Sequence, residues 1–158
     1  MLALLFFLSV LDGTLLLSSK PNTLVGNVAR RLTGGDKYTH IAVVIEDIVY
    51  ESNWPRSKAT AISSYGHKKE IVHYYEPKIP YTKEEIEKMR ITSKSEIGKP
   101  YRLKNYLWPN SREVDGGWCS PFVGKVLNAS GRYRLNKNQT YEPQNLIDSI
   151  IVDYNRIK

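Results

Sequence analysis

The only cysteine of the chain, Cys119, lies in a sequence that predicts a reactive thiol. Two glycines precede it, and Pro121 suits the first turn of a helix, where a missing N–H group costs nothing. Cys119 is therefore expected at or next to a helix amino terminus, where unpaired N–H groups and the helix dipole favour the thiolate. The alternative is a small buried cysteine that packs beneath the helix. The apolar residues that follow recur at helical spacing: Phe122, Val123, Val126 and Leu127.

A catalytic cysteine needs a base that takes its proton, and this base is usually a histidine. The chain has three histidines. His67 lies in a polar run typical of a solvated turn, and His73 lies within a predicted strand, where an ordinary packed imidazole is expected. His40 opens an otherwise apolar strand, so its ring is expected at a sheet edge, where it can face a helix end. Position alone leaves His40 open between a functional and a structural role.

A third group must orient the imidazole, and Glu51 is the candidate. Glu46 and Asp47 predict a tight turn between strands at 40–45 and 48–52. This hairpin brings Glu51 roughly level with His40, and cross-strand neighbours lie about 5 Å apart between their Cβ atoms. A carboxylate there can accept the imidazole N–H and stabilise the imidazolium. The alternative for Glu51 is an exposed charge at the end of a strand.

The pattern of apolar residues predicts one α+β domain. Strands are expected at 14–18, 40–45, 48–52, 70–75 and, at an edge, 151–154. Helices are expected from residue 22 or 23 to 32, from Thr82 to about Ile97, after Cys119, and from 141 to 150. Thr82 and Glu85 form a capping-box pattern at the start of the second helix. Ile86, Met89 and Ile97 are expected on its inner face.

Composition agrees with a globular domain and indicates acidic partners. The chain has 158 residues, of which 41% are hydrophobic and 25% are charged, and its net charge is +7. A basic surface favours anionic lipid, a cell-wall polymer or nucleic acid. The basic residues are scattered and no nucleic-acid motif is present, so no specific nucleic-acid site is expected. A single cysteine excludes an internal disulfide. Separately, we expect the protein to be a monomer.

Residues 1–11 form a separate apolar segment, and residues 12–158 form the domain. The stretch from Met1 to Val10 is too short to cross a bilayer as a helix. No Lys or Arg precedes it and no Ala-x-Ala site follows, so the pattern of a signal peptide is incomplete. A signal peptide, a buried terminal helix and an anchor in a membrane interface all stay open. Export, membrane association and association with a virion are compatible with these alternatives.

Several motifs, taken in order, resemble the circularly permuted NlpC-like cysteine peptidases and amidases. Such proteins have a papain-like fold with a rotated element order, so the histidine precedes the cysteine. The family includes bacterial YiiX-like proteins and viral members, and is related to lecithin–retinol acyltransferases. Two features depart from it: the apolar residues 1–10, and Asp12-Gly13 in place of a usual Gly-Asp. The matching segments are residues 12–17, 38–45, 49–52, 97–101, 118–123 and 142–146.

The resemblance implies an antiparallel sheet packed against helices, including the helix of the nucleophile. By position, it implies that Cys119 is the nucleophile, His40 the general base and then acid, and Glu51 the polar third residue. Tyr101 matches a tyrosine whose hydroxyl lines the site near the oxyanion, with a packing aromatic as the alternative. Trp118 matches the residue before the nucleophile, in the oxyanion and substrate region.

The implied activity is that of a thiol-dependent hydrolase of amide or ester bonds that works through an acyl-enzyme. Its substrates would be cell-wall peptides or lipid-linked acyl groups, with no cofactor. A catalytically silent binding or virion-associated module of the same fold stays open, although the presence of Cys119, His40 and Glu51 counts against it. A zinc site at Cys119 and His40 is a further alternative. Zinc normally takes more ligands at close spacing, and none are seen, so no metal is expected.

Overall fold

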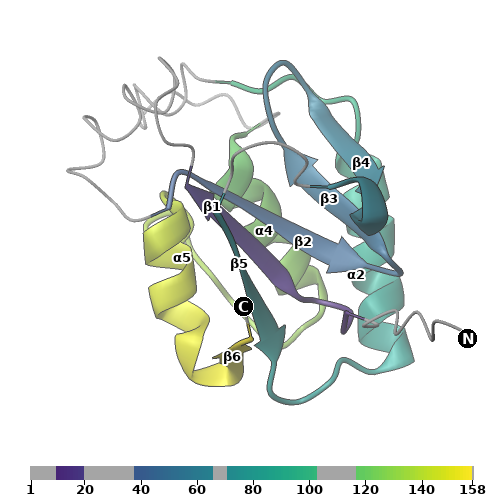
Figure 1. The fold of residues 1–158 in the computed structure, drawn as a ribbon, viewed down its shortest axis with the longest axis vertical. Helices are drawn as coiled ribbons and strands as arrows, with labels where there is room; N and C mark the ends of the chain where they lie inside the picture. Colours follow the sequence, from purple (N-terminus) through teal and green to yellow (C-terminus); the bar gives the residue numbers. More distant parts are fainter. Residues whose placement is uncertain (1–9, 20–37, 66–70, 103–116, 158) are drawn as a thin grey trace, which may run out of the picture.

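One antiparallel sheet forms the frame of the molecule. The computed structural model describes residues 10–19, 38–65, 71–102 and 117–157. Within them, six strands pair in the order β4-β3-β2-β1-β5-β6 (Figure 1). The strands are β1 Leu15–Ser19, β2 His40–Ile45, β3 Ile48–Ser52, β4 Ser57–Ala61, β5 Ile71–Pro77 and β6 Tyr154–Arg156. The helices are α2 Lys83–Glu96, α4 Cys119–Ala129 and α5 Pro143–Ile150, with 3₁₀ turns at Ile62–Ser64 and Ile151–Asp153.

These elements confirm the predicted α+β class, with an antiparallel sheet that packs against helices. Helix α4, which begins at the cysteine, packs against β2, β3 and α2. Figure 1 shows α2 and α4 together on one side of the sheet, and α5 at the edge near β5 and β6. Helix α4 is therefore held against the strand that begins with His40.

The β2–β3 hairpin has the bounds that the sequence predicted. Glu46 and Asp47 form its turn, and both have positive φ angles, 51° and 59°. Such backbone twist matches the right-handed twist of the flanking strands in a two-residue hairpin. The backbone N–H of Glu46 donates to Asp12 Oδ1 at 2.5 Å, which ties this turn to the turn before β1. The resulting register pairs Val43 with Tyr50.

Alternating side chains of β2 are buried in two separate clusters. Ile41, Val43 and Ile45 are fully buried in the large cluster that also contains the apolar residues of α4. Ala42 and Val44 face the other way, in a smaller cluster with Leu16 and Val49. Because both faces of β2 are covered, the strand reads as an unbroken apolar run rather than as an alternating one.

Helix α2 has the predicted bounds, with Thr82 as its N-cap and Ile97 as its C-cap. Thr82 Oγ1 accepts from the N–H of Glu85 at 3.3 Å, and Glu85 Oε2 accepts from the N–H of Thr82 at 2.7 Å, which completes the capping box. Met89 is fully buried and Ile86 packs against the large cluster. The prediction that Ile97 lies on the inner face was wrong, because the side chain of this C-cap residue is 39% exposed.

Three parts of the sequence pattern differ from the structure or lie outside it. Strand β4 was not predicted, because it pairs only with β3 and most of its residues are exposed, so it has no apolar alternation. The predicted edge strand at 151–154 begins later, since residues 151–153 form a 3₁₀ turn. Residues 1–9, the predicted helix after residue 22 and most of the loop at 102–115 lie outside the described residues.

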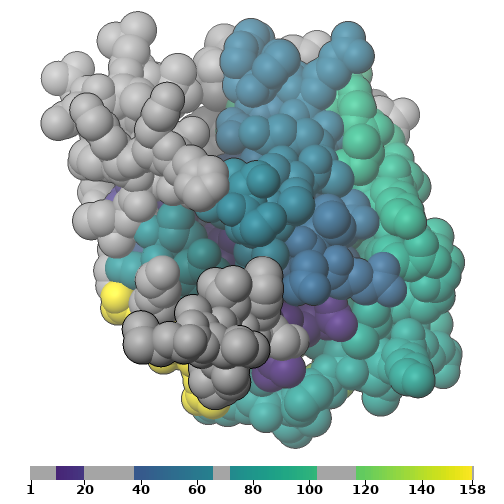
Figure 2. Space-filling model, turned by 45° about the vertical axis from the view of Figure 1, so that its right-hand side comes forward, coloured from purple at the N-terminus to yellow at the C-terminus, as the bar shows by residue number. Residues whose placement is uncertain are grey.

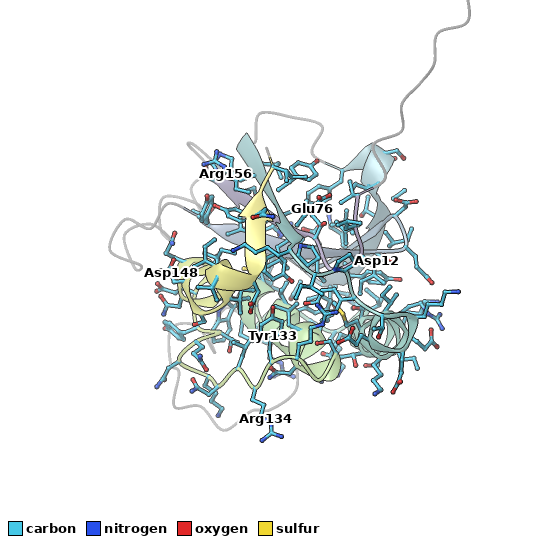
Figure 3. The ribbon with its side chains drawn as sticks, turned by 90° about the horizontal axis from the view of Figure 1, so that it is seen from below. Asp12, Glu76, Tyr133, Arg134, Asp148 and Arg156 are labelled. Carbon is cyan, nitrogen blue, oxygen red and sulfur yellow. The ribbon has the colours of Figure 1, made fainter. Side chains whose placement is uncertain are left out.

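At the end of the sheet away from His40, the turn before β1 contacts β5. Leu11 N–H donates to Glu76 Oε1 at 3.4 Å, and Figure 3 labels Asp12 and Glu76 at this end. Val10 packs against the smaller cluster. Gly13 has a φ of 83°, and its carbonyl accepts from the Tyr154 hydroxyl at 3.2 Å. None of the helices in the described ranges is long and apolar enough to span a membrane.

Candidate active site

Cys119 is the first residue of α4, as its neighbours predicted. Trp118 precedes it with extended backbone angles, and Pro121 lies in the first turn, where its missing N–H removes no helical hydrogen bond. The N–H groups of this turn have no partner within the helix, and the helix dipole adds positive potential there. The cysteine is also 3% exposed, so it lies both at the helix start and in a buried position.

His40 and Glu51 form a short buried contact. His40 Nε2 lies 2.5 Å from Glu51 Oε2, and the two residues are 8% and 2% exposed. Two further groups hold the same carboxylate. Lys58 Nζ lies 3.1 Å from Oε1, and the Tyr65 hydroxyl donates to Oε2 at 3.3 Å. Four polar groups therefore converge from β2, β3, β4 and the residue after the first 3₁₀ turn.

The predicted register of Glu51 needs a correction. Strand β3 pairs Tyr50 with Val43, so continuing the ladder by one residue sets Glu51 opposite Ala42 rather than level with His40. His40 and Ala42 lie on one face of β2, because side chains alternate along a strand. Glu51 is therefore a diagonal neighbour of His40, at a separation that a long side chain spans.

The thiol completes the group on the other side of the imidazole. Because Nε2 is engaged by Glu51, Nδ1 is the ring nitrogen left for Cys119, and the imidazole lies close enough to the thiol for each to shift the pKa of the other. The backbone of Ile41 also helps to lower the pKa of the thiol, and Ser120 Oγ lies 3.8 Å from Sγ. The structure thus brings Cys119, His40 and Glu51 together in a line.

The electrostatics of this line favour an ion pair. Burial alone would raise the pKa of the Cys119 thiol, but hydrogen bonding and the charge of His40 outweigh it and lower that pKa. Burial opposes the imidazolium, yet the hydrogen bonds to Cys119 and Glu51 raise the pKa of His40 to about 10. Burial would also raise the pKa of Glu51, but His40 and then Lys58 lower it to about 2. The arrangement favours a thiolate beside an imidazolium at neutral pH.

The Glu51–His40 pair predicts a bell-shaped contribution to stability. Glu51 stabilises the fold fully above its ordinary pKa of about 4.5 and loses this effect as the pH falls toward 2. His40 contributes fully below its ordinary pKa of about 6.5 and loses this effect as the pH rises toward 10. We therefore expect Glu51→Gln to have a lower free energy of unfolding than the wild type. The difference should be largest at about pH 5.5 and smallest near pH 3 and pH 10.

Urea unfolding across this pH range measures the effect. Lys58→Met is the matched control, because it removes another partner of the same carboxylate and leaves the contact with His40. The free energy of unfolding of Lys58→Met minus that of Glu51→Gln should still show a bell-shaped dependence on pH. A difference between wild type and Glu51→Gln that stays flat from about pH 3 to pH 10 would contradict a charged pair.

Trp118 and Tyr101 are placed differently from the three central residues. The Trp118 indole N–H donates to the carbonyl of Tyr141 at 2.6 Å, and the two rings meet edge to face at 5.5 Å. This N–H is thereby engaged in packing the start of α4 against the segment before α5. Tyr101 is half-buried against the large cluster, and its backbone N–H donates to the carbonyl of Pro55 at 2.9 Å. A role of either residue near the oxyanion stays a prediction.

The other two histidines lie away from the described contacts of Cys119, His40 and Glu51 or outside the described residues, and two partners of Glu51 were not predicted. His73 Nδ1 lies 2.8 Å from the Tyr38 hydroxyl, in agreement with an ordinary packed imidazole, and His67 lies outside the described residues. Sequence reasoning missed Lys58 and Tyr65 as partners of Glu51. Only recognition of β4 could have found Lys58, because its pairing sets Lys58 directly opposite Glu51.

Comparisons with known proteins bear on the fold. No family model and no curated protein matches the chain. The structure is similar to the crystal structure of the metalloprotein YiiX from Escherichia coli O157:H7, with a TM-score of 0.72 and 17% sequence identity. The match covers 94% of this chain and 97% of that chain. YiiX belongs to the permuted papain-like superfamily that the motifs resemble, so the chain shares the fold of a member of that superfamily.

Proposed function

We propose that this protein is a cysteine-dependent hydrolase of amide or ester bonds. The observation that carries the proposal is the buried line from Cys119 through His40 to Glu51, with a 2.5 Å contact between His40 Nε2 and Glu51 Oε2 and the sulfur at a helix amino terminus. A nucleophile, a base within hydrogen-bond reach and a group that orients the base are the parts that acyl transfer requires. The fold shared with YiiX agrees with this chemistry.

The chemistry begins with attack of the Cys119 thiolate on a carbonyl carbon. A carbon–sulfur bond forms and the carbonyl electrons move to oxygen, where the backbone N–H of Cys119 can hold the negative charge. The bond to the leaving group then breaks as His40 donates its proton to the departing nitrogen or oxygen. Water attacks the thioester, gives a proton to His40, and releases the acid and the thiolate. Glu51 holds the tautomer and orientation of the imidazole throughout.

The substrates that we propose are cell-wall peptides or lipid-linked acyl groups. A net charge of +7 supports contact with an anionic wall polymer or an anionic membrane. Both substrate classes present an amide or ester carbonyl to the thiolate, so the site itself serves either. We propose that the protein acts as a monomer, because all three central side chains come from one chain.

A metal centre is the competing function, since YiiX is called a metalloprotein. The donor set of the residues that the structure describes does not fit one. Among the described residues, no three His, Cys, Asp or Glu side chains are grouped closely enough to hold a metal ion. Both nitrogens of His40 already face partners, Glu51 on one side and the thiol on the other. No step of the proposed reaction therefore runs through a metal.

Acylation by p-nitrophenyl acetate tests the proposal without knowledge of the natural substrate. We expect a burst of nitrophenolate, and mass spectrometry should find one acetyl group on the peptide that contains Cys119. Cys119→Ser should abolish both. The thioester should then disappear as water resolves it. Acetylation no faster than that of a free thiol would overturn the proposal and leave the silent binding module.

A further inference from the structure

An exposed tryptophan lies at the end of the sheet where His40 and Glu51 meet. Trp54 is 71% exposed, although tryptophan side chains are mostly buried on average. It follows Ser52, the last residue of β3, by two residues, so its backbone lies within about 7 Å of that serine. The Ser52 hydroxyl donates to the carbonyl of Gly117 at 3.1 Å, just before α4 begins. Trp54 and the start of α4 therefore lie at the same end of the sheet.

Backbone contacts hold the segment of Trp54 against the chain that follows α2. The carbonyl of Pro55 accepts from the N–H of Tyr101 at 2.9 Å, and Arg56 forms an isolated bridge with Pro100. In Figure 2 the blue surface of β3, β4 and their connection reaches the top of the molecule, beside the green surface at the end of α2. The tryptophan therefore stands on a segment that two backbone contacts support.

The surroundings of Trp54 are basic. Segments 52–61 and 97–102 contain no Asp or Glu and four basic residues: Arg56, Lys58, Lys99 and Arg102. Two carboxylates of neighbouring positions pair with two of these cations. Glu51 Oε1 lies 3.1 Å from Lys58 Nζ. Glu96 Oε1 lies 2.9 Å from Lys99 Nζ, so four cations and two carboxylates leave a net charge of +2.

We propose that Trp54, Pro55, Arg56 and Lys58 form a docking edge that binds an anionic lipid bilayer. An indole ring, with its apolar body and one polar N–H, is the side chain that proteins place at the level of lipid headgroups. The basic residues around it supply the charge that attracts anionic headgroups. Docking brings the end of the molecule that holds the start of α4 to the membrane. The inference rests on the proposed function, and it narrows the substrates to the acyl groups of lipids.

Sedimentation of the full chain with lipid vesicles tests the docking edge. We expect the protein to pellet with vesicles of phosphatidylglycerol and phosphatidylcholine in equal parts, and much less with phosphatidylcholine alone. Trp54→Ser should lower the partition coefficient about tenfold, because the indole no longer leaves water for the headgroup region. Trp54→Phe should retain part of the binding. Arg56→Met should lower the coefficient about fivefold, and this loss should shrink at higher salt.

Val152→Ser is the matched control, because Val152 is also 71% exposed and lies at the opposite end of the sheet. It precedes β6, where Tyr154 pairs with Pro77 at the end of β5, whereas His40 pairs with Ser18 at the other end of β1. Figure 1 shows β6 and the end of β5 at the bottom and the β3–β4 connection at the top. Val152→Ser should therefore bind vesicles as the wild type does.

Two results would overturn the docking edge. One is a partition coefficient that Trp54→Ser leaves unchanged or that Val152→Ser lowers equally. The other is a loss in Trp54→Ser of binding to insoluble peptidoglycan but not to vesicles, which would make a wall polymer the partner. Failure of the proposed function looks different, since p-nitrophenyl acetate is soluble and reports on Cys119 without a membrane. Absent acetylation together with vesicle binding that depends on Trp54 would retain the docking edge and remove the hydrolase.

Discussion

Replacing His40 by alanine is expected to slow the alkylation of Cys119 by iodoacetamide at about pH 6 roughly 100-fold. In the wild type, His40 lowers the pKa of the Cys119 thiol, which favours the thiolate. Without the imidazolium, burial favours the neutral thiol, and the pKa of the thiol rises to its ordinary value of about 8.5 or above. The rate of alkylation follows the fraction of thiolate, so it reports this ion pair directly.

His73→Ala is the matched control, because His73 is a second strand histidine whose described contact is with Tyr38. It should leave the rate at Cys119 unchanged. The rates of wild type and His40→Ala should converge near pH 10, where either thiol is largely ionised. Circular dichroism checks that both variants fold. Equal rates for wild type and His40→Ala at about pH 6 would contradict the proposed ion pair of Cys119 and His40. They would also contradict the proposal that Cys119 is the nucleophile.

Replacing Gly13 by alanine is expected to lower the free energy of unfolding by about 4 kcal/mol. Gly13 has a φ of 83°, a conformation that costs a residue with a Cβ atom about 1–2 kcal/mol. A Cβ atom there would also lie 2.2 Å from Cε2 of Tyr81. Tyr81 cannot move aside easily, because it is 6% exposed and its hydroxyl lies 3.0 Å from that of Tyr154. Overpacking of this kind adds about 1–3 kcal/mol.

Gly131→Ala separates the two causes. Gly131 has a φ of 87°, yet a Cβ atom there meets nothing within 4 Å. Its substitution should therefore cost only the backbone part, about 1–2 kcal/mol. Urea unfolding at neutral pH measures both variants against the wild type. If the two substitutions cost the same, the contact with Tyr81 contributes nothing and the ring moves freely.

Local signals in the sequence were sufficient for the elements that position the thiol. The capping box at Thr82 and Glu85 is a contact between residues three apart, so the pattern shows it. The turn at Glu46 and Asp47 likewise depends on neighbours, and it set the bounds of β2 and β3. The start of α4 at Cys119 followed from the residues around it. Each of these features is decided within about one turn of backbone.

Pairings between distant segments could be decided only by the tertiary structure. Lys58 reaches Glu51 because β4 adds to the edge of β3, and nothing in its polar sequence predicted a strand. The register of the hairpin made Glu51 a diagonal neighbour of His40 rather than a level one. The exposed Ile97 shows the same limit, since the end of α2 is set by where the chain must turn toward β4.

Residue types, through their intrinsic chemistry, already identified a thiol, an imidazole and a carboxylate that could act together. Whether these three groups act together depends on the charges that the thiol and the imidazole carry once they are buried, and no local sequence pattern shows this. The tertiary structure brings the start of α4 to the start of β2, and Cys119 and His40 are both buried there. Exclusion of water strengthens the attraction between them, and this attraction lowers the thiol pKa against the opposing effect of burial.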